Sequence, residues 1–433
     1  MYLTEITHAE ERQRALLVGV LQGASAWEAE DSLDELSRLA ATAGLDTADR
    51  VLQARERIDA TFYIGKGKAA QLKSLAQASR ADLIVFDNDL SPAQMRNLEE
   101  ASDMRILDRS GLILDIFAHH ARTRTAQIQV ELAQLKYLLP RLTRMWNHLS
   151  RQAGGGAIRG MGAAGVRGPG ETQLETDRRL IRNRIGNLTT KLRQIDRRLS
   201  TNRKRRSETF KVALVGYTNA GKSTLMRAIS GADVLVQDQL FATLDSTTRT
   251  VDMDTGRPIL LTDTVGFIKQ LPQDLFASFR TTLEEALEAD LLLHVVDISH
   301  PHYEAQMEAV ETVLRELEVE DKPTLLVFNK VDQLGGENGF ERERGPDRDA
   351  VSVSALTGVG LERLKEQIRG ASLADSVTLD LHIPQREGRL LAQLHEQGEI
   401  LEQDFQAEAV NLRVRLDKGW IGRWQLERFA VRR

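Results

Sequence analysis

The eight residues from Gly216 to Ser223 combine glycine, lysine and serine at the spacing of a phosphate-binding loop. They follow the apolar run Val212–Val215 and precede a stretch with helical spacing, which is the context that such a loop requires. Backbone N–H groups would surround the phosphates, Lys222 would neutralise the β- and γ-phosphates, and the Ser223 hydroxyl would ligate Mg²⁺. The predicted nucleotide-binding residues of this loop are Gly216, Tyr217, Thr218, Asn219, Ala220, Gly221, Lys222, Ser223 and Thr224.

A second apolar run, Ile259–Leu261, leads to a carboxylate and a glycine that are expected to face the same phosphates. Asp263 would hold Mg²⁺ through a water molecule, and the backbone N–H of Gly266 would sense the γ-phosphate. The predicted contacts of this segment are Asp263, Thr264, Val265 and Gly266.

The base is predicted to be guanine, from a carboxylate that follows a third apolar run, Leu325–Phe328. Asp332 can accept two hydrogen bonds from the N1–H and 2-amino groups of guanine, an edge that adenine does not present. A buried polar group that the wrong base leaves unpaired can discriminate by about 10⁴. The predicted base contacts are Asn329, Lys330, Val331, Asp332, Ser354, Ala355 and Leu356. The order of these motifs predicts an enzyme that hydrolyses GTP to GDP and phosphate.

Between the phosphate loop and Asp263 lies a segment in the position of a switch loop, which orders around the γ-phosphate and Mg²⁺. Its members are Phe241, Ala242, Thr243, Leu244 and Asp245. Thr243 is the predicted second hydroxyl ligand of Mg²⁺, with Thr247 as the alternative. Lys222, Thr243 and Gly266 are therefore the predicted catalytic residues. Phe267 stands where many GTPases have a glutamine that orients water, so we expect slow intrinsic hydrolysis.

The chain that carries these motifs has 433 residues, which suggests about three domains. Hydrophobic residues make up 41% and charged residues 28%, so whole-chain disorder and a fibrous repeat are disfavoured. The absence of cysteine excludes disulfides, thiolate nucleophiles and Cys-ligated metal sites, and fits a reducing cytoplasm. The apolar runs are shorter than the roughly 18 residues of a membrane helix, and the acidic start does not resemble a signal peptide.

The net charge of −5 hides a strong segregation of charge along the chain. Residues 141–206 hold 17 basic and four acidic side chains, a net +13, which leaves −18 on the rest. Such a split indicates an element that faces a polyanion.

Two apolar series with 4-3 spacing, as in coiled coils, occur in and beside this basic segment. They are Ile128, Leu132, Leu135, Leu139, Leu142 and Trp146, and Ile181, Ile185, Leu188, Leu192, Ile195 and Leu199. We expect an antiparallel helical hairpin, with the glycine-rich basic stretch 154–170 as its tip. Pro140 should kink or end the first helix.

Two interpretations of the hairpin are open: a packing or dimerising coiled coil with a solvated basic face, or an arm that binds nucleic acid. The second is favoured because basic residues continue through a loop that packing does not require. Stacking groups and cations near the tip, namely Trp146, His148, Arg151, Arg159 and Arg167, indicate RNA rather than DNA. Arg151, Arg159 and Arg167 are the candidate RNA contacts.

The predicted fold is α/β, with a mostly parallel GTPase sheet and further domains. We expect an N-terminal α/β domain over 1–122, the hairpin over 123–208, the GTP-binding domain over 209–372 and a small α+β domain over 373–433. The stretch Tyr63–Lys68 is either a phosphate site at a helix N-terminus or a turn that glycine permits. In the last domain, Trp420, Arg423, Trp424 and the Arg432-Arg433 end either touch a partner or are packing aromatics and a solvated basic tail, and the second reading is favoured.

Several of these strings together resemble the HflX family of bacterial GTPases, which bind ribosomes. They are the GTPase motifs with Phe241–Asp245, Asp263–Ile268 and Arg167–Glu175, and in the first domain Tyr63–Lys68 and Asp108–Gly111. The resemblance covers nearly the whole chain and weakens over the last 60 residues or so. Ser246 departs from the proline that is frequent in the family, without removing a proposed ligand.

The resemblance implies a Mg²⁺-dependent GTPase whose hairpin reaches 23S rRNA of the large (50S) ribosomal subunit, with GTP favouring the bound state. It also implies that the protein splits stalled or idle 70S ribosomes into subunits under stress. Because Phe267 cannot orient water, we expect the large subunit to stimulate hydrolysis. We expect a cytoplasmic protein, a monomer, with no DNA partner.

Three hypotheses from different classes follow. The first is this ribosome-splitting GTPase. The second is a GTP-gated assembly or translation checkpoint factor in which hydrolysis only resets binding. The third is an ATP-driven RNA remodeller that uses Lys66 and Lys68, which would require ATP turnover that survives Asp332→Asn.

Overall fold

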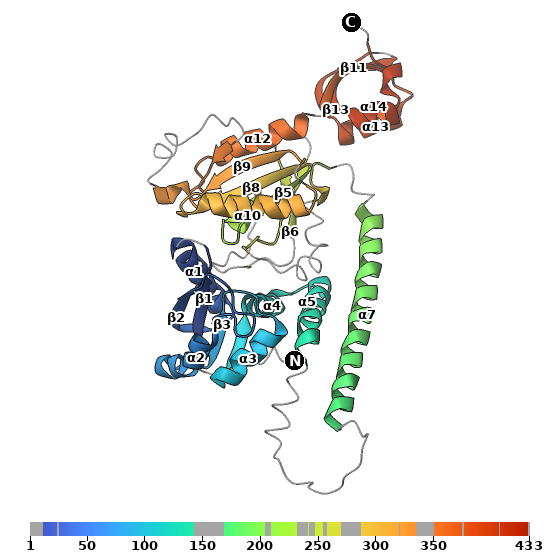
Figure 1. Ribbon diagram of the computed structural model, residues 1–433. Helices are drawn as coiled ribbons and strands as arrows, with labels where there is room; N and C mark the ends of the chain where they lie inside the picture. The colour runs from blue at the N-terminus through green and yellow to red at the C-terminus, as the bar shows by residue number, and fades with distance from the viewer. Residues whose placement is uncertain are drawn as a thin grey trace. The chain divides into compact units, whose positions relative to one another are not determined.

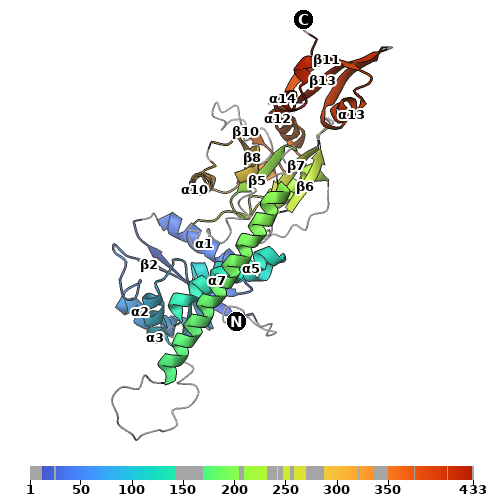
Figure 2. The ribbon, with the colours of Figure 1, turned by 90° about the vertical axis from the view of Figure 1, so that its right-hand side faces the viewer.

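The computed structural model describes residues 12–23, 26–142, 169–203, 209–231, 241, 247–253, 258–269, 287–319, 321–334, 350–374, 376–406 and 408–431. Contacts divide the chain into two units (Figures 1 and 2). The N-terminal unit contains residues 1–201 and also Phe241, and the second unit contains the GTP-binding sheet and the C-terminal sheet. Each unit is described by itself.

The N-terminal unit contains a four-stranded parallel sheet in the order β2-β1-β3-β4. Its strands are β1 (Arg14–Leu21), β2 (Asp46–Ala54), β3 (Leu83–Phe86) and β4 (Arg105–Asp108). Strands β1 and β3 are apolar runs that are mostly inaccessible to solvent, because helices cover a parallel sheet. Sequence reasoning missed β2, since this edge strand is largely exposed and has no apolar run.

Four helices connect and follow these strands: α1 (Ala26–Thr42), α2 (Lys66–Ser79), α3 (Pro92–Ser102) and α4 (Arg109–His120). The start of α3 is encoded locally, because Ser91 and Gln94 form a capping box and Pro92 occupies the first turn. The start of α4 is capped by Asp108, whose carboxylate accepts a hydrogen bond from the Gly111 N–H at 2.8 Å.

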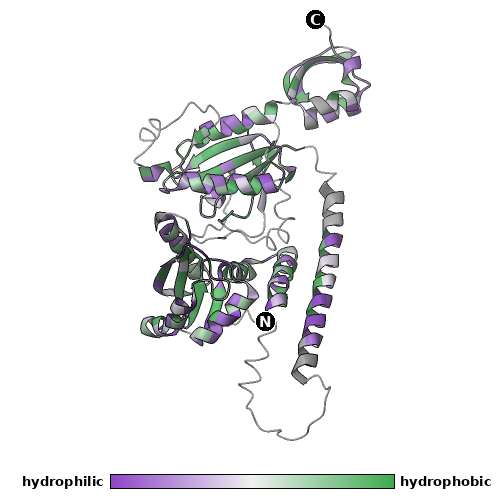
Figure 3. Cartoon of the chain, viewed as in Figure 1, coloured by the Kyte–Doolittle hydropathy of each residue, from purple (hydrophilic) through white to green (hydrophobic). Residues whose placement is uncertain are grey.

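Helices α5 (Arg124–Leu138) and α7 (Pro169–Arg203) pack through the predicted apolar seams and lie side by side (Figures 1 and 2). The buried contact residues are Ile128, Leu132, Leu188 and Leu192. Outside this seam α7 is largely hydrophilic (Figure 3). Helix α5 gives way to the short 3₁₀ helix η1 (Leu139–Arg141) at Pro140, as expected for a residue that lacks an N–H. The predicted tip, with Arg151, Arg159 and Arg167, lies outside the described residues.

Two basic side chains of the hairpin segment form ion pairs with acidic residues of the same unit. Arg141 donates a hydrogen bond to the Leu90 carbonyl at 2.8 Å, forms an ion pair with the buried carboxylate of Asp108 at 3.1 Å, and stacks over the Tyr137 ring. Arg184 pairs with Glu131 across the two helices at 2.7 Å. The charge available to an external polyanion is therefore smaller than the sequence count indicates.

Asp115 of α4 gives the N-terminal unit a pH-dependent stability. Its side chain is fully buried, and neither oxygen has a hydrogen-bond partner among the described residues. Burial raises its pKa to about 7, with Arg105 opposing. The folded state therefore holds a proton that the unfolded state releases near pH 4, so stability falls as the pH rises from about 4 to about 7.

We expect Asp115→Asn to raise the midpoint of thermal unfolding by several degrees at pH 8 and much less at pH 5. The gain at pH 8 corresponds to about 2 to 4 kcal/mol, because the amide carries no charge to bury. Exposed Asp49→Asn is the control. Equal shifts for Asp115→Asn at the two pH values would contradict the assignment.

The GTP-binding sheet has six strands in the order β10-β9-β8-β5-β7-β6, all parallel except β6. Its strands are β5 (Lys211–Gly216), β6 (Thr247–Asp252), β7 (Pro258–Asp263), β8 (Leu291–Asp297), β9 (Thr324–Asn329) and β10 (Ala350–Ser352). The helices are α8 (Lys222–Ser230), α10 (Tyr303–Glu316) and α12 (Leu361–Leu373), with the 3₁₀ helix η3 (Val331–Leu334). The predicted mostly parallel α/β fold is confirmed.

The C-terminal domain is a three-stranded antiparallel sheet in the order β11-β13-β12. Its elements are β11 (Ser376–Pro384), α13 (Gly388–Gln397), β12 (Glu399–Phe405), β13 (Ala409–Asp417), α14 (Lys418–Arg423) and the 3₁₀ helix η4 (Leu426–Arg428). Trp420 and Trp424 stack at 4.3 Å and join the apolar core, in agreement with their interpretation as packing residues. Strand β12 was missed, because it is an exposed, charged strand.

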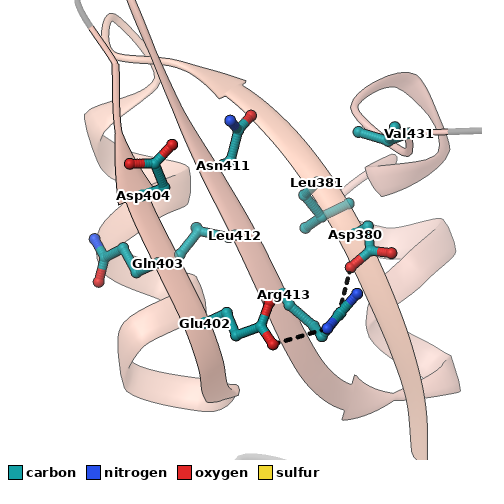
Figure 4. Close-up of a pocket in the computed structure, with 9 residues that line it drawn as sticks. All are labelled: Asp380, Leu381, Glu402, Gln403, Asp404, Asn411, Leu412, Arg413 and Val431. Atoms are coloured by element: carbon teal, nitrogen blue, oxygen red, sulfur yellow. Dashed lines mark hydrogen bonds and ion pairs between the residues drawn. The ribbon is translucent and has the colours of Figure 1, made fainter.

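A hollow of about 330 Å³ lies on this sheet and is lined by residues of all three strands, among them Arg413 of β13 (Figure 4). The Arg413 guanidinium donates hydrogen bonds to Asp380 on one neighbouring strand and Glu402 on the other, both at 2.8 Å. These hydrogen bonds link all three strands and pair the positive charge of Arg413 with two carboxylates.

No helix of the described residues is long and apolar enough to cross a membrane.

Candidate functional site

The predicted phosphate loop, Gly216–Ser223, runs from the last residue of β5 to the second residue of α8. At Gly221 the backbone has φ +91°, and an added Cβ would lie 2.2 Å from the Asn329 side-chain nitrogen. Only glycine suits this position, because the backbone is left-handed and the neighbour is too close. The first N–H groups of a helix have no partner within the helix, so the start of α8 is the local basis for binding phosphate.

The side chain of Lys222 is buried and contacts the backbone of the phosphate loop. Its Nζ donates hydrogen bonds to the carbonyl oxygens of Gly216 at 3.0 Å and Tyr217 at 2.7 Å. Burial lowers the pKa of Lys222 to about 8, and the nearby charge of Asp263 opposes this shift. A cation held this way is positioned to neutralise phosphate at the start of α8.

The two predicted metal ligands that the structure describes are in direct contact. The Ser223 hydroxyl donates a hydrogen bond to the Asp263 carboxylate at 2.6 Å, and Asp263 is almost fully buried at the end of β7. A hydroxyl and a carboxylate are the oxygen ligands that Mg²⁺ prefers. The donor set therefore fits Mg²⁺ beside the nucleotide phosphates.

The segment after Asp263 is joined to the phosphate loop by backbone hydrogen bonds. The Thr218 N–H donates to the Phe267 carbonyl at 2.7 Å, and the Phe267 N–H donates to the Gly216 carbonyl at 3.0 Å. Gly266 lies so close to the loop that an added Cβ would be 2.9 Å from the Thr218 Cα and 3.0 Å from Lys222 Nζ. The Phe267 side chain is only 2% exposed, so it is part of the interior and does not orient water.

The predicted guanine contacts converge from the ends of β9 and β10. The Asn329 amide donates to the Ala220 carbonyl at 2.9 Å and accepts from the Ala355 N–H at 3.0 Å, which links the base motifs to the phosphate loop. The Ser354 hydroxyl donates to the Asp332 carboxylate at 2.6 Å and fixes its orientation. The side chain of Leu356 is 75% exposed, so its predicted contribution can come only from the backbone or an exposed surface.

The predicted switch residues are described only in part. Phe241 is buried in the N-terminal unit, with its ring edge-to-face on Phe117 of α4 at 4.7 Å. Ala242, Thr243, Leu244 and Asp245 lie outside the described residues. Thr247, the alternative ligand, opens β6 and pairs in register with Asp263.

Sequence reasoning missed two residues that support the site. His294 of β8 is buried, and desolvation together with the Lys222 charge lowers its pKa to about 4, so the imidazole is neutral beneath the loop. A single histidine inside the apolar run Leu291–Asp297 was the available signal. Asp297 pairs with Lys330 at 2.7 Å and thereby positions the segment that leads to Asp332.

Three family models match consecutive parts of the chain. They are described as GTP-binding GTPase N-terminal over residues 30–118, GTP-binding GTPase Middle Region over 120–206 and 50S ribosome-binding GTPase over 211–330. Together they cover strands β2, β3 and β4 of the N-terminal sheet, helices α5 and α7, and most of the GTP-binding sheet.

Curated relatives match nearly the full length. A protein named GTPase HflX from Caldanaerobacter subterraneus subsp. tengcongensis is 42% identical over 407 residues, covering 94% of this chain and 91% of that protein. The GTPase HflX of Escherichia coli is 42% identical over 391 residues, covering 89% and 90%. A GTP-binding protein of Sulfolobus solfataricus, solved in complex with GDP, is 25% identical with a TM-score of 0.43, covering 83% of this chain and 98% of that one.

Proposed function

We propose, from the premise that this chain belongs to the HflX family of GTPases, that it uses GTP to separate ribosomes into their subunits. The chain is a ribosome-associated GTP-binding protein that hydrolyses GTP. We also propose that hydrolysis depends on Mg²⁺, that the hairpin contacts 23S rRNA of the 50S subunit, and that the 70S ribosome is the substrate. The protein is proposed to act as a monomer in the cytoplasm.

The observation that carries the ribosomal part is the basic face of α7. The side chains of Arg179, Arg182 and Arg193 are exposed and share one side of α7 by helical periodicity, while the apolar seam of the same helix is buried against α5. A row of exposed cations on a rigid helix binds a nucleic-acid backbone through charge and shape, without reading sequence. The candidate RNA contacts Arg151, Arg159 and Arg167 extend this row along the chain.

In the nucleotide site, Lys222 would neutralise the β- and γ-phosphates, and the Gly266 N–H would hold a γ-phosphate oxygen. Bound Mg²⁺, held by Ser223, by Thr243 and through water by Asp263, would offset the negative charge that develops on the phosphates. The side chain of Phe267 cannot orient the attacking water. We therefore propose that the large subunit stimulates hydrolysis, by ordering the switch segment or supplying a positioning group.

Sedimentation of intact 70S ribosomes tests this proposal. With GTP or a non-hydrolysable analogue, the wild type should convert a 70S peak into 30S and 50S peaks, whereas Lys222→Ala should leave it intact. A variant with residues 154–170 shortened should keep GTP binding and lose splitting.

Two outcomes would contradict the proposal. Splitting that survives loss of the tip would refute the role of the hairpin. Co-sedimentation with 50S subunits without any splitting would instead support the checkpoint function.

A further inference from the structure

Thr218 of the phosphate loop carries a buried hydroxyl group to which the structure gives no packing role. The residue is 6% exposed, and its Oγ1 has no hydrogen-bond partner among the described residues. Buried polar groups are nearly always hydrogen-bonded in folded proteins, so an unpaired one calls for an explanation. Because this hydroxyl belongs to the loop that binds the phosphates, we looked for its partner in the reaction itself.

The Thr218 side chain lies beside the groups that are proposed to hold the γ-phosphate. A Cβ added to Gly266 would meet both the Thr218 Cγ2 and the Lys222 Nζ at 3.0 Å. The backbone fixes this arrangement, because the Thr218 N–H donates a hydrogen bond to the Phe267 carbonyl at 2.7 Å. All four residues belong to the second unit. The unpaired hydroxyl therefore lies at the end of the loop where hydrolysis takes place.

The attacking water requires a hydrogen-bond acceptor that turns its lone pair toward the γ-phosphorus. The Lys222 ammonium and the Gly266 N–H can only donate, and the Phe267 side chain has no polar atom. A hydroxyl can accept as well as donate, so Thr218 has the chemistry that these three neighbours lack.

The other hydroxyl groups described next to the phosphate loop have partners of their own. The Thr264 hydroxyl donates to the Leu214 carbonyl of β5 at 2.7 Å. The Ser223 hydroxyl donates to the carboxylate of Asp263, and both of these groups are proposed Mg²⁺ ligands. Among these described side chains, Thr218 is the acceptor with neither a partner nor a role at the metal.

We propose that Thr218 is a catalytic residue of the GTPase, whose hydroxyl accepts a hydrogen bond from the attacking water and orients it as Phe267 cannot. The water oxygen bonds to the γ-phosphorus, and the bond to the bridging oxygen breaks with its electron pair leaving on GDP. The water proton passes to an oxygen of the released phosphate, so the threonine itself is unchanged. This inference rests on the proposed position of the γ-phosphate at Gly266.

Single-turnover hydrolysis by full-length protein, with and without 50S subunits, tests the proposal. Thr218→Val keeps the branched shape of the side chain and removes the hydroxyl. We expect it to slow hydrolysis about ten- to a hundredfold in both conditions, because the water is no longer oriented. The dissociation constants for GDP and for a non-hydrolysable GTP analogue should stay within about twofold, since the contact is made to the water alone.

Two further variants at position 218 separate the hydroxyl from the packing of the side chain. Thr218→Ser keeps the hydroxyl and should hydrolyse GTP within about threefold of the wild-type rate. Thr218→Ala should show the same loss as Thr218→Val, and it serves as the second route if valine impairs folding. GDP affinity reports whether each variant retains an intact loop.

Thr262→Val is the matched control for losing a buried threonine hydroxyl. Thr262 of β7 is 8% exposed, and its hydroxyl pairs with that of Thr248 at 3.0 Å, away from the phosphate loop. This variant should change the hydrolysis rate by less than about twofold, because its hydroxyl has a partner within the sheet.

Two results would overturn the role of Thr218. One is a hydrolysis rate of Thr218→Val within about twofold of wild type. The other is weaker binding of the analogue with an unchanged rate for bound GTP, which would place the hydroxyl on the γ-phosphate instead. Gly266→Ala tests the underlying premise: wild-type hydrolysis in that variant would refute the γ-phosphate position itself, whereas loss there without loss in Thr218→Val would refute only the role of Thr218.

Discussion

Asp332→Asn is expected to weaken GTP binding by about a thousandfold and to confer binding of xanthosine triphosphate. The Asp332 carboxylate can accept from the N1–H and 2-amino groups of guanine, and an amide nitrogen placed there would face a donor with another donor. Loss of a matched polar contact in such a site costs on the order of 10³ to 10⁵ in discrimination. Xanthine carries a carbonyl in place of the 2-amino group, so the asparagine amide can donate to it.

The Asp332 carboxylate is held in place by hydrogen bonds. Asp332 accepts a hydrogen bond from Ser354 at 2.6 Å, and the Ser354 hydroxyl in turn accepts from the Thr357 N–H at 3.1 Å, so the carboxylate is held in one orientation. Competition binding with GTP, ATP and xanthosine triphosphate measures the change. Asp321→Asn makes the same chemical change at an exposed position and should bind GTP normally. Unaltered GTP affinity in Asp332→Asn would assign base selection to other residues.

Gly266→Ala is expected to reduce GTP hydrolysis at least about a hundredfold while GDP affinity changes by no more than a few-fold. The new Cβ would lie 2.9 Å from the Thr218 Cα and 3.0 Å from Lys222 Nζ, so the segment must move away from the phosphate loop. The Gly266 N–H would then leave the position of the γ-phosphate, and removal of one such donor costs about 10² to 10³ in rate. GDP presents no γ-phosphate and is largely unaffected.

Single-turnover hydrolysis and GDP titration measure the two effects separately. Gly370→Ala is the control, because Gly370 lies in α12 and an added Cβ would meet no atom of the described residues within 4 Å. It should be neutral or slightly stabilising, since alanine favours helix. Comparable losses of GTP hydrolysis and GDP binding in Gly266→Ala would indicate general damage to the loop instead.

Much of the nucleotide site was predictable because its parts are local. The strings Gly216–Ser223, Asp263–Gly266 and Asn329–Asp332 each follow an apolar strand, and parallel strands bring their carboxyl ends to one edge of a sheet. The start of α3 is local in the same way, because the Ser91 hydroxyl accepts a hydrogen bond from the Gln94 N–H three residues later. Strands β2 and β12 could not be predicted, because neither carries an apolar run. Strand β2 is largely exposed, and β12 is an exposed, charged edge strand.

The sequence by itself determined the nucleotide chemistry, the choice of guanine and the existence of a basic helical arm, since each depends on residue type and short spacing. Only the tertiary structure decided how individual groups are used. Arg141 counts toward the basic segment, yet it is paired with the buried Asp108, and His294 is kept neutral near Lys222. Phe241 belongs by sequence to the GTP-binding domain and by packing to Phe117 of the N-terminal unit. These outcomes depend on burial and on contacts between residues far apart in the chain, which neither composition nor periodicity records.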